Sequence, residues 1–237
     1  FSSYGQFYEV YLEGRATPKS RTQNLRELIE ASAPELIDAA YAERYVNNGQ
    51  RERARAVTDA VMKTAGQAIT RSTWAVNQGE DRDLKILKSL RVDIGRDTKN
   101  ISSVVVSDSL ANSALKLLRR GQSIKNKQSA DTWPSDINAS APLLVYLPTE
   151  NRIIISNALL QAPVFDGQGG AVDYGAFGTL FAQQLSLALY QAAFKNVTVL
   201  NTQRSSLITQ YNGYTLSGAK KVNGTLTSTQ NLADLSG

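Results

Sequence analysis

The chain has 237 residues, and neither histidine nor cysteine occurs among them. These absences exclude Ser-His-Asp and Cys-His triads, histidine-based zinc or haem sites, disulfides and zinc fingers. Lys and Arg together number 26 against 21 Asp and Glu, which gives a formal net charge of +5. This mild excess is weaker than the concentrated basic face of a nucleic-acid-binding domain, so we expect no nucleic-acid partner.

Charged residues are distributed unevenly along the chain. Residues 1–140 contain 21 Lys and Arg and 17 Asp and Glu, whereas residues 141–237 contain 5 and 4. Charged side chains are rarely buried unless they are paired. We therefore predict a charged helical region over residues 1–140, followed by a part with many buried elements over residues 141–237.

The first part has the hydrophobic periodicity of helices. Apolar residues recur with helical spacing from Leu25 to Tyr41, and Pro34 marks a break or a new first turn within that stretch. The same periodicity predicts further helices over residues 51–74, 83–90 and 109–120.

The second part opens with strand signals and continues with an apolar helix. Runs of apolar and β-branched residues predict strands over 143–147 and 152–156, separated by a turn-like linker. The most hydrophobic helix is predicted over residues 174–194. Its adjacent Gln183 and Gln184 would be costly inside a bilayer, so we expect a buried helix and no membrane span. The fold class expected from these patterns is mainly α with a small β element.

The end of the chain combines a flexible connection with a further helix. Residues 211–224 are rich in Gly, Asn and Ser and predict a connection. A last helix is expected to begin within residues 231–235.

Three stretches of the second part follow the pattern of a known family. They read PTENRIIISNALLQAPVF over residues 148–165, VDYGAFG over 172–178 and VNGTLTSTQNLADLSG over 222–237. They resemble N-P-x-x-N-x-I-x-F-P-A-A-I-L-Q-P-P-F-F, V-N-Y-G-x-I-G, and V-N-G-x-L-T with G-E-N-I-A-D-L-G-G, of the neprilysin and endothelin-converting-enzyme family of zinc metallopeptidases. The resemblance covers nearly the whole chain and is most specific over residues 148–237.

The family resemblance implies a zincin (gluzincin)-like metallopeptidase scaffold that is incomplete in this chain, with residues 141–237 as a degenerate metallopeptidase core. Family members extend on both sides of the matching region. We therefore expect either a fragment of a longer polypeptide or a partner chain that supplies the rest.

The resemblance places the family's zinc site on positions without zinc-binding side chains. The two histidines of H-E-x-x-H, at i and i+4 on one helical face, fall on Gln183 and Leu187, and the general base between them falls on Gln184. The third ligand, a downstream glutamate, falls on Gln230. Asp234 stands where the family keeps a carboxylate that orients a zinc-bound histidine.

These substitutions remove the chemistry that the family site needs. Leucine has no donor atom, and neutral amides are poor zinc ligands beside imidazole and carboxylate. A glutamine cannot accept a proton as a general base. We therefore predict no catalytic residue, no bound metal and no cofactor, and a solvated or hydrogen-bonded role for Asp234.

The substrate-binding edge strand of the family departs from its pattern as well. That strand reads N-A-x-Y and pairs with the peptide backbone. Counting back without a gap from Pro148 places residues 143–146, Leu-Leu-Val-Tyr, at this motif. Asn138 and Ala139 fit it only with an insertion of several residues, so the substrate-anchoring Asn is missing from the ungapped alignment.

The departures predict a pseudopeptidase, a catalytically inactive protein that acts as a protein-binding, peptide-binding or structural subunit of a larger assembly. Its partner would be another protein or the remainder of the same polypeptide. The alternative is a residual or divergent peptidase whose metal ligands lie outside this segment. The resemblance also implies a location in the bacterial periplasm or cell envelope, including an envelope complex, or outside the cell.

Overall fold

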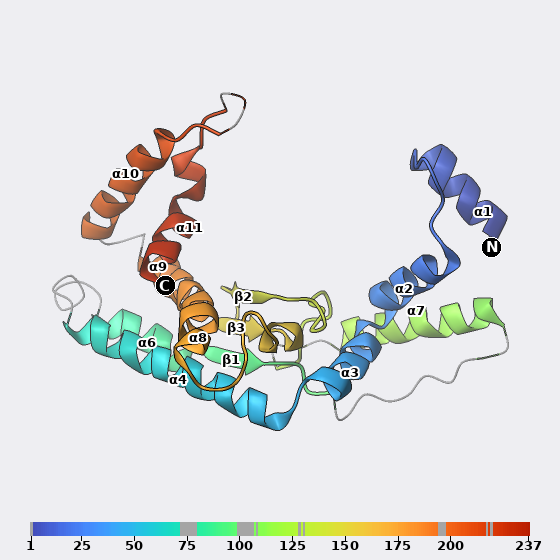
Figure 1. Ribbon diagram of the computed structural model, residues 1–237, viewed down its shortest axis with the longest axis horizontal. Coiled ribbons are helices and arrows are strands. Elements are labelled where there is room, and N and C mark those ends of the chain that lie inside the picture. The colour runs from blue at the N-terminus through green and yellow to red at the C-terminus, as the bar shows by residue number, and fades with distance from the viewer. Residues whose placement is uncertain are drawn as a thin grey trace. The chain divides into compact units, whose positions relative to one another are not determined.

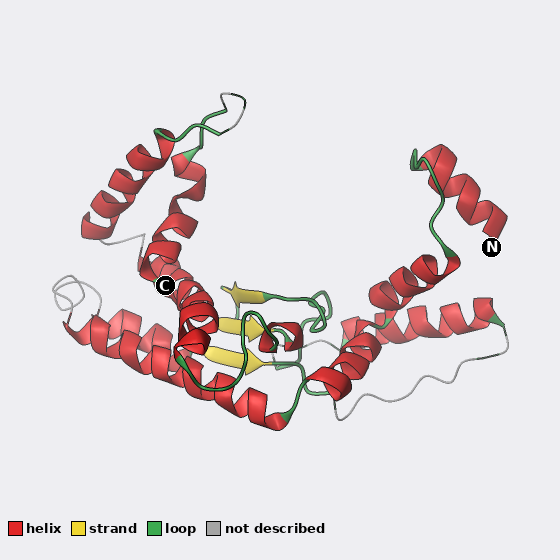
Figure 2. Cartoon of the chain, in the orientation of Figure 1, coloured by secondary structure: helices red, strands yellow, loops and turns green. Residues whose placement is uncertain are grey.

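The computed structural model describes residues 2–71, 80–98, 107, 109–127, 129, 131–193, 198–216, 218 and 220–237. Helices make up most of these residues, and a small sheet lies among them (Figures 1 and 2). The expected mainly α fold with a small β element is thereby confirmed. The helix predicted over residues 51–74 is present, although Trp74 at its predicted end lies outside the described residues.

The chain forms two compact units, each assembled from two separate segments. The first comprises residues 1–44 and 97–140, and the second comprises residues 45–96 and 141–237. Residues 45–96 thus pack with the C-terminal part. The charge distribution suggests a boundary near residue 140 between a charged helical region and a part with many buried elements. That boundary stays a prediction.

The regular secondary structure described in the first unit is all helical. Two of its helices begin at serine N-caps: Ser20 Oγ accepts the backbone N–H of Gln23, and Ser109 Oγ accepts that of Asn112. Helix packing is close enough that a Cβ on Gly121 would lie 2.1 Å from the carbonyl oxygen of Ser32. The helices are α1 (Ser2–Phe7), which continues as a π-helical turn (Tyr8–Leu12), α2 (Arg21–Ser32), α3 (Pro34–Tyr45) and α7 (Leu110–Asn126).

The second unit combines the sheet with the longest helix. This helix, α4 (Asn48–Arg71), begins at a reciprocal cap in which Asn47 and Gln50 each accept the other's backbone N–H through a side-chain oxygen. The remaining elements are α6 (Glu80–Ser89), β1 (Arg91–Ile94), β2 (Leu144–Leu147), β3 (Arg152–Ile155), a 3-10 turn (Asn157–Leu160), α8 (Ala171–Asp173), a π-helical turn (Tyr174–Gly178), α9 (Thr179–Ala193), α10 (Thr198–Asn212) and α11 (Gly224–Ser236).

The sheet has the strand order β1-β3-β2, so β3 is central and β2 lies at one edge. β3 pairs in parallel with β1 and antiparallel with β2. All four residues of β3 are buried, as expected of a central strand that is covered on both faces. Arg152, only 1% exposed, begins this strand and forms ion pairs with Asp93 and with Glu150.

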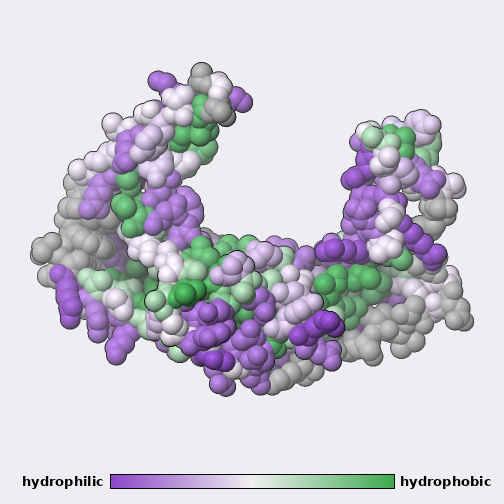
Figure 3. Space-filling model, viewed as in Figure 1, coloured by the Kyte–Doolittle hydropathy of each residue, from purple (hydrophilic) through white to green (hydrophobic). Residues whose placement is uncertain are grey.

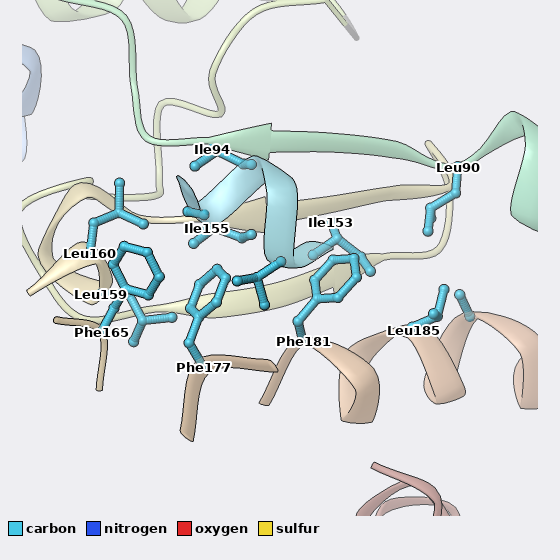
Figure 4. Packing of buried hydrophobic residues seen from close by; sticks show 13 residues of the cluster. Leu90, Ile94, Ile153, Ile155, Leu159, Leu160, Phe165, Phe177, Phe181 and Leu185 are labelled. Atoms are coloured by element: carbon cyan, nitrogen blue, oxygen red, sulfur yellow. The ribbon is translucent and has the colours of Figure 1, made fainter. Parts of the chain in front are cut away.

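The hydrophobic core of the second unit lies between the sheet and its helices. Ile153 and Ile155 of β3 pack with Phe177 of the π-helical turn and with Phe181 of α9, and both rings project toward the strands (Figure 4). Phe165 joins this cluster with its ring centroid 5.0 Å from that of Phe177. The core therefore fixes which face of α9 turns toward the sheet.

Apolar side chains also remain exposed. Figure 3 shows hydrophobic residues among hydrophilic ones on the face in view. On α11, Leu226 and Leu235 are 82% and 74% exposed. Among the described residues, no helix combines the length and the apolar character needed to cross a bilayer.

Candidate peptidase-like site

The orientation of α9 decides where the residues aligned with the family's zinc site lie. Phe177, Phe181, Leu185 and Ala188 recur at helical spacing and are buried in the core. Gln183 and Leu187, one turn apart, share a different face and are both half-buried. The apolar spacing that the sequence displays is thus the reason why these two positions are kept out of the core.

Gln183 connects α9 to α11. Its Nε2 donates a hydrogen bond to Oδ1 of Asp234. Close to this bond the two helices approach each other directly, because a Cβ on Gly237 would lie 2.9 Å from both the backbone N of Gln183 and the carbonyl oxygen of Thr179. A further bond joins the hydroxyl groups of Tyr190 and Ser236.

Gln184 connects α9 to the edge strand β2. Its Oε1 accepts the backbone N–H of Tyr146 at 2.9 Å, and its side chain is nearly buried. Ser156 donates its backbone N–H to the carbonyl oxygen of Leu143, so odd-numbered residues of this strand bond to β3. The backbone groups of Tyr146 consequently face away from β3, toward α9.

The remaining aligned positions are less enclosed. Gln230 is exposed on α11, one turn before Asp234, and Leu187 is half-buried on α9. The structure therefore brings Gln183 and Asp234 into contact and directs Gln184 to β2. The sequence alignment alone did not predict either hydrogen bond.

The donor set at these positions does not fit a zinc ion. Three of the four side chains that replace the ligands and the base are neutral amides, and the fourth is a hydrocarbon. Within the part of the chain that the structure describes, three or more His, Cys, Asp or Glu side chains nowhere gather into a possible metal site. Any zinc site of the whole protein would need ligands other than Gln183, Leu187 and Gln230.

Tyr146, whose backbone N–H bonds to Gln184, has a partly buried side chain. Burial raises the pKa of its phenol above the ordinary value, so the hydroxyl keeps its proton at neutral pH. The hydroxyl lies 3.2 Å from Oδ1 of Asn151, to which it donates. The side chain of Tyr146 is therefore held beside the end of the turn that leads into β3.

The loop before α9 is held by an acidic residue that sequence reasoning missed. Asp173 is fully buried, and its carboxylate accepts the backbone N–H groups of Asp166, Gly167 and Gly169 at 2.9–3.3 Å. The signal in the sequence is a Gly-rich loop followed within a few residues by Asp, a pattern in which the carboxylate satisfies main-chain donors. This carboxylate anchors the chain just before the π-helical turn that leads into α9.

A short mixed sheet with an edge strand, beside the packed helices α9 and α11, agrees with the zincin-like metallopeptidase scaffold that the family resemblance implies. Residues 144–237 match Peptidase family M13, the family of neprilysin and the endothelin-converting enzymes. The resemblance to this family is therefore confirmed for the part of the chain that contains β2, β3, α9 and α11.

Relatives with similar sequences come from a bacterium and from insects. A zinc metalloproteinase encoded in the scaA 5' region of Streptococcus gordonii is 36% identical over 107 residues, which are 39% of this chain and 19% of that protein. An endothelin-converting enzyme homologue of Locusta migratoria is 29% identical over 127 residues, 47% of this chain and 17% of the relative. Neprilysin-3 of Drosophila melanogaster is 27% identical over 135 residues, 51% of this chain and 16% of the relative.

Solved structures share the fold over almost the whole chain. The open state of the zinc metalloprotease Zmp1 of Mycobacterium tuberculosis superposes with a TM-score of 0.82 at 21% identity, covering 99% of this chain and 41% of that protein. PepO of Lactobacillus rhamnosis gives a TM-score of 0.75 at 21% identity, covering 97% and 40%. The chain thus spans about two fifths of the length of these structures, and under one fifth of the curated relatives is matched.

The comparisons correct the predicted function. The family is a peptidase family, and these relatives and structural neighbours carry the names of zinc metalloproteinases, a neprilysin and an endothelin-converting enzyme homologue. The prediction of an inactive binding or structural subunit is wrong in this light, because it was drawn from four side chains of a segment that covers a minor part of its relatives.

Proposed function

We propose that the chain is part of an M13-type peptidase that acts on peptides, and that this part forms the edge strand and the helix pair beside the cleavage site. The observation that carries the proposal is the placement of β2, α9 and α11 together within the region that matches the family. The names of the relatives supply the reaction class, hydrolysis of peptide bonds.

The residues of this chain have a role in holding the peptide. The backbone N–H and C=O of Leu144 and the C=O of Tyr146 alternate with the groups that bond to β3, so they line the outer edge of β2, while the N–H of Tyr146 is held by Gln184. An extended peptide gains main-chain hydrogen bonds when it adds to such an edge.

The groups that activate water are assigned to other residues of the whole protein. The amides of Gln183, Gln184 and Gln230 and the side chain of Leu187 do not fit the zinc that the family implies. The predicted location at the cell envelope or outside the cell remains a proposal that fractionation of the source cells would check.

The test is peptide cleavage by the intact protein, combined with measurement of its zinc content. We expect the protein to cleave unstructured peptides, as measured by mass spectrometry, and a chelator to abolish this cleavage. Elemental analysis should give stoichiometric zinc. A folded intact protein that binds no zinc and cleaves none of a diverse peptide mixture would overturn the proposed activity.

A matched pair of variants tests the role of the edge strand. Leu144→Pro removes one outward N–H from β2, whereas Leu144→Ala keeps it and serves as the control. We expect Leu144→Pro to lower peptide cleavage at least about tenfold relative to Leu144→Ala, since one main-chain hydrogen bond contributes about 1 kcal/mol and its partner on the peptide is left unpaired. Equal cleavage by two folded variants would refute this role.

A further inference from the structure

Two adjacent glutamines on α9 use opposite halves of their amides. Gln183 donates through Nε2 to the carboxylate of Asp234 on α11, and Gln184 accepts through Oε1 from the backbone N–H of Tyr146 on β2. An amide carries both a donor and an acceptor, whereas an ionised carboxylate carries acceptors alone. The same residue type therefore meets two opposite requirements at neighbouring positions.

The surroundings give each bond a defined geometry. α11 approaches α9 so closely that a Cβ on Gly237 would lie 2.9 Å from the backbone N of Gln183. On the other side, the side chain of Gln184 is 9% exposed and its acceptor lies 2.9 Å from the Tyr146 nitrogen. The enclosed bond of Gln184 is costly to leave unmade, because water cannot readily replace the lost partner, whereas the bond between Gln183 and Asp234 lies at an exposed site.

We infer that Gln183 and Gln184 form a metal-independent bracket that positions α11 and β2 on α9. The bracket stands where the family's ligands and base would lie, and its donor and acceptor groups join protein elements to one another without an ion. Both glutamines are positioning residues. Their role in assembling this region is independent of the hydrolysis proposed above, so it can be tested separately.

The bracket predicts that one chemical change has unequal effects at two neighbouring positions. Gln183→Glu replaces the donor with a carboxylate that faces Asp234, so the hydrogen bond becomes a like-charge contact. Gln184→Glu keeps an acceptor for the N–H of Tyr146, and a charged acceptor makes a stronger bond. Gln230→Glu, the same change at an exposed position of α11, is the matched control.

The experiment measures amide hydrogen exchange and thermal unfolding of these variants in the intact protein. We expect Gln183→Glu to speed exchange in α11 by about fivefold, and Gln184→Ala to do the same at Tyr146, since each loses one side-chain bond of about 1 kcal/mol. Gln184→Glu should leave exchange at Tyr146 as slow as in the wild type or slower. Gln230→Glu should leave both regions unchanged.

Reversal of the bond supplies the decisive control. In the double variant Gln183→Glu with Asp234→Asn, the new amide donates to the new carboxylate, so slow exchange in α11 should return. A purely steric role for these side chains would not give this rescue. Asp234→Asn alone keeps an acceptor for Gln183 and should have a small effect, which provides a readout even where Gln183→Glu does not fold.

Three results would overturn the inference. One is equal loss of protection from exchange in Gln183→Glu and Gln184→Glu. Another is a double variant that exchanges in α11 as fast as Gln183→Glu, although Asp234→Asn alone exchanges like the wild type. The third is loosening of the contact between α9 and α11 by a chelator in the wild-type protein, because that would show that an ion holds this junction.

Discussion

The carboxylate of Asp173 should be the main anchor of the loop that leads into α9. Its two oxygens accept three backbone N–H groups, from Asp166, Gly167 and Gly169. Asp173→Ala removes all three acceptors, whereas Asp173→Asn keeps one oxygen and turns an N–H₂ group toward a donor. The alanine variant should therefore be the more destabilised of the two.

The magnitude follows from where the three donors lie. Gly167 is buried, so its N–H loses its partner outright, at a cost of about 1.5 kcal/mol. Asp166 and Gly169 are exposed, so water replaces much of each lost bond and each contributes about half as much. The expected loss of unfolding free energy is about 3 kcal/mol for Asp173→Ala and about 1 kcal/mol for Asp173→Asn.

Chemical denaturation and amide exchange measure this loss together. Denaturation gives the change in unfolding free energy, and exchange at Gly167 reports local opening of the loop. Val172→Ala, at the position before Asp173, is the matched control. The side chain of Val172 is 60% exposed, so its truncation should change stability by less than about 0.5 kcal/mol. If Asp173→Ala matches this control in both measurements, the carboxylate does not hold the loop and our reasoning is wrong.

Three further variants probe the packing and the charges of the two units. Phe181→Ala empties a fully buried site and should lower the unfolding free energy, measured by denaturation, by about 3–5 kcal/mol. Leu180→Ala, at a position 38% exposed, should lower it far less, and similar losses in the two variants would contradict the assigned core. Gly121→Ala should lower the unfolding midpoint of the first unit, with a loss of about 2 kcal/mol, because its Cβ would lie 2.1 Å from the Ser32 carbonyl oxygen. Gly5→Ala, with nothing within 4 Å of the new Cβ, is its control, and equal midpoints would contradict that close contact. Burial raises the pKa of Asp83 despite the hydrogen bond from Arg82, so the folded state holds this proton more tightly and loses stability as pH rises through the folded pKa. Asp83→Asn should therefore stabilise the protein more at pH 8 than at pH 4, and denaturation curves with the opposite trend would refute this sign.

The helices that periodicity located are those with a clear apolar face. The expected helix over 51–74 corresponds to α4, and the expected strands over 143–147 and 152–156 correspond to β2 and β3. β1 was not predicted, because Arg91–Ile94 alternates charged and apolar residues over only four positions and gains its partner from distant β3. α10 was not predicted either, since its polar sequence has little periodicity and its contacts with α11 are tertiary.

The candidate site, like the fold, could be predicted from the sequence only in part. Alignment to the family motifs placed Gln183, Gln184 and Asp234 in one region, because spacing along a helix is readable from sequence. It did not reveal that the two amides bond in opposite directions, since that depends on how β2 and α11 lie against α9. The burial of Arg152 between two carboxylates was equally hidden, because Asp93, unlike nearby Glu150, becomes its neighbour only after the strands pair.

The parallel pairing of β1 with β3 has a consequence for synthesis on the ribosome. Arg91 pairs with Arg152, so the first strand emerges well before its partner exists. At about 5–20 residues per second, the delay is roughly 3–12 seconds. During that interval Ala54 and Val57 on the apolar face of α4 lack the side chains of β3 and α9 with which they pack in the finished protein. We therefore expect nascent chains that contain β1 but not yet β3 to bind chaperones. The chaperones should be released once β3 has left the exit tunnel.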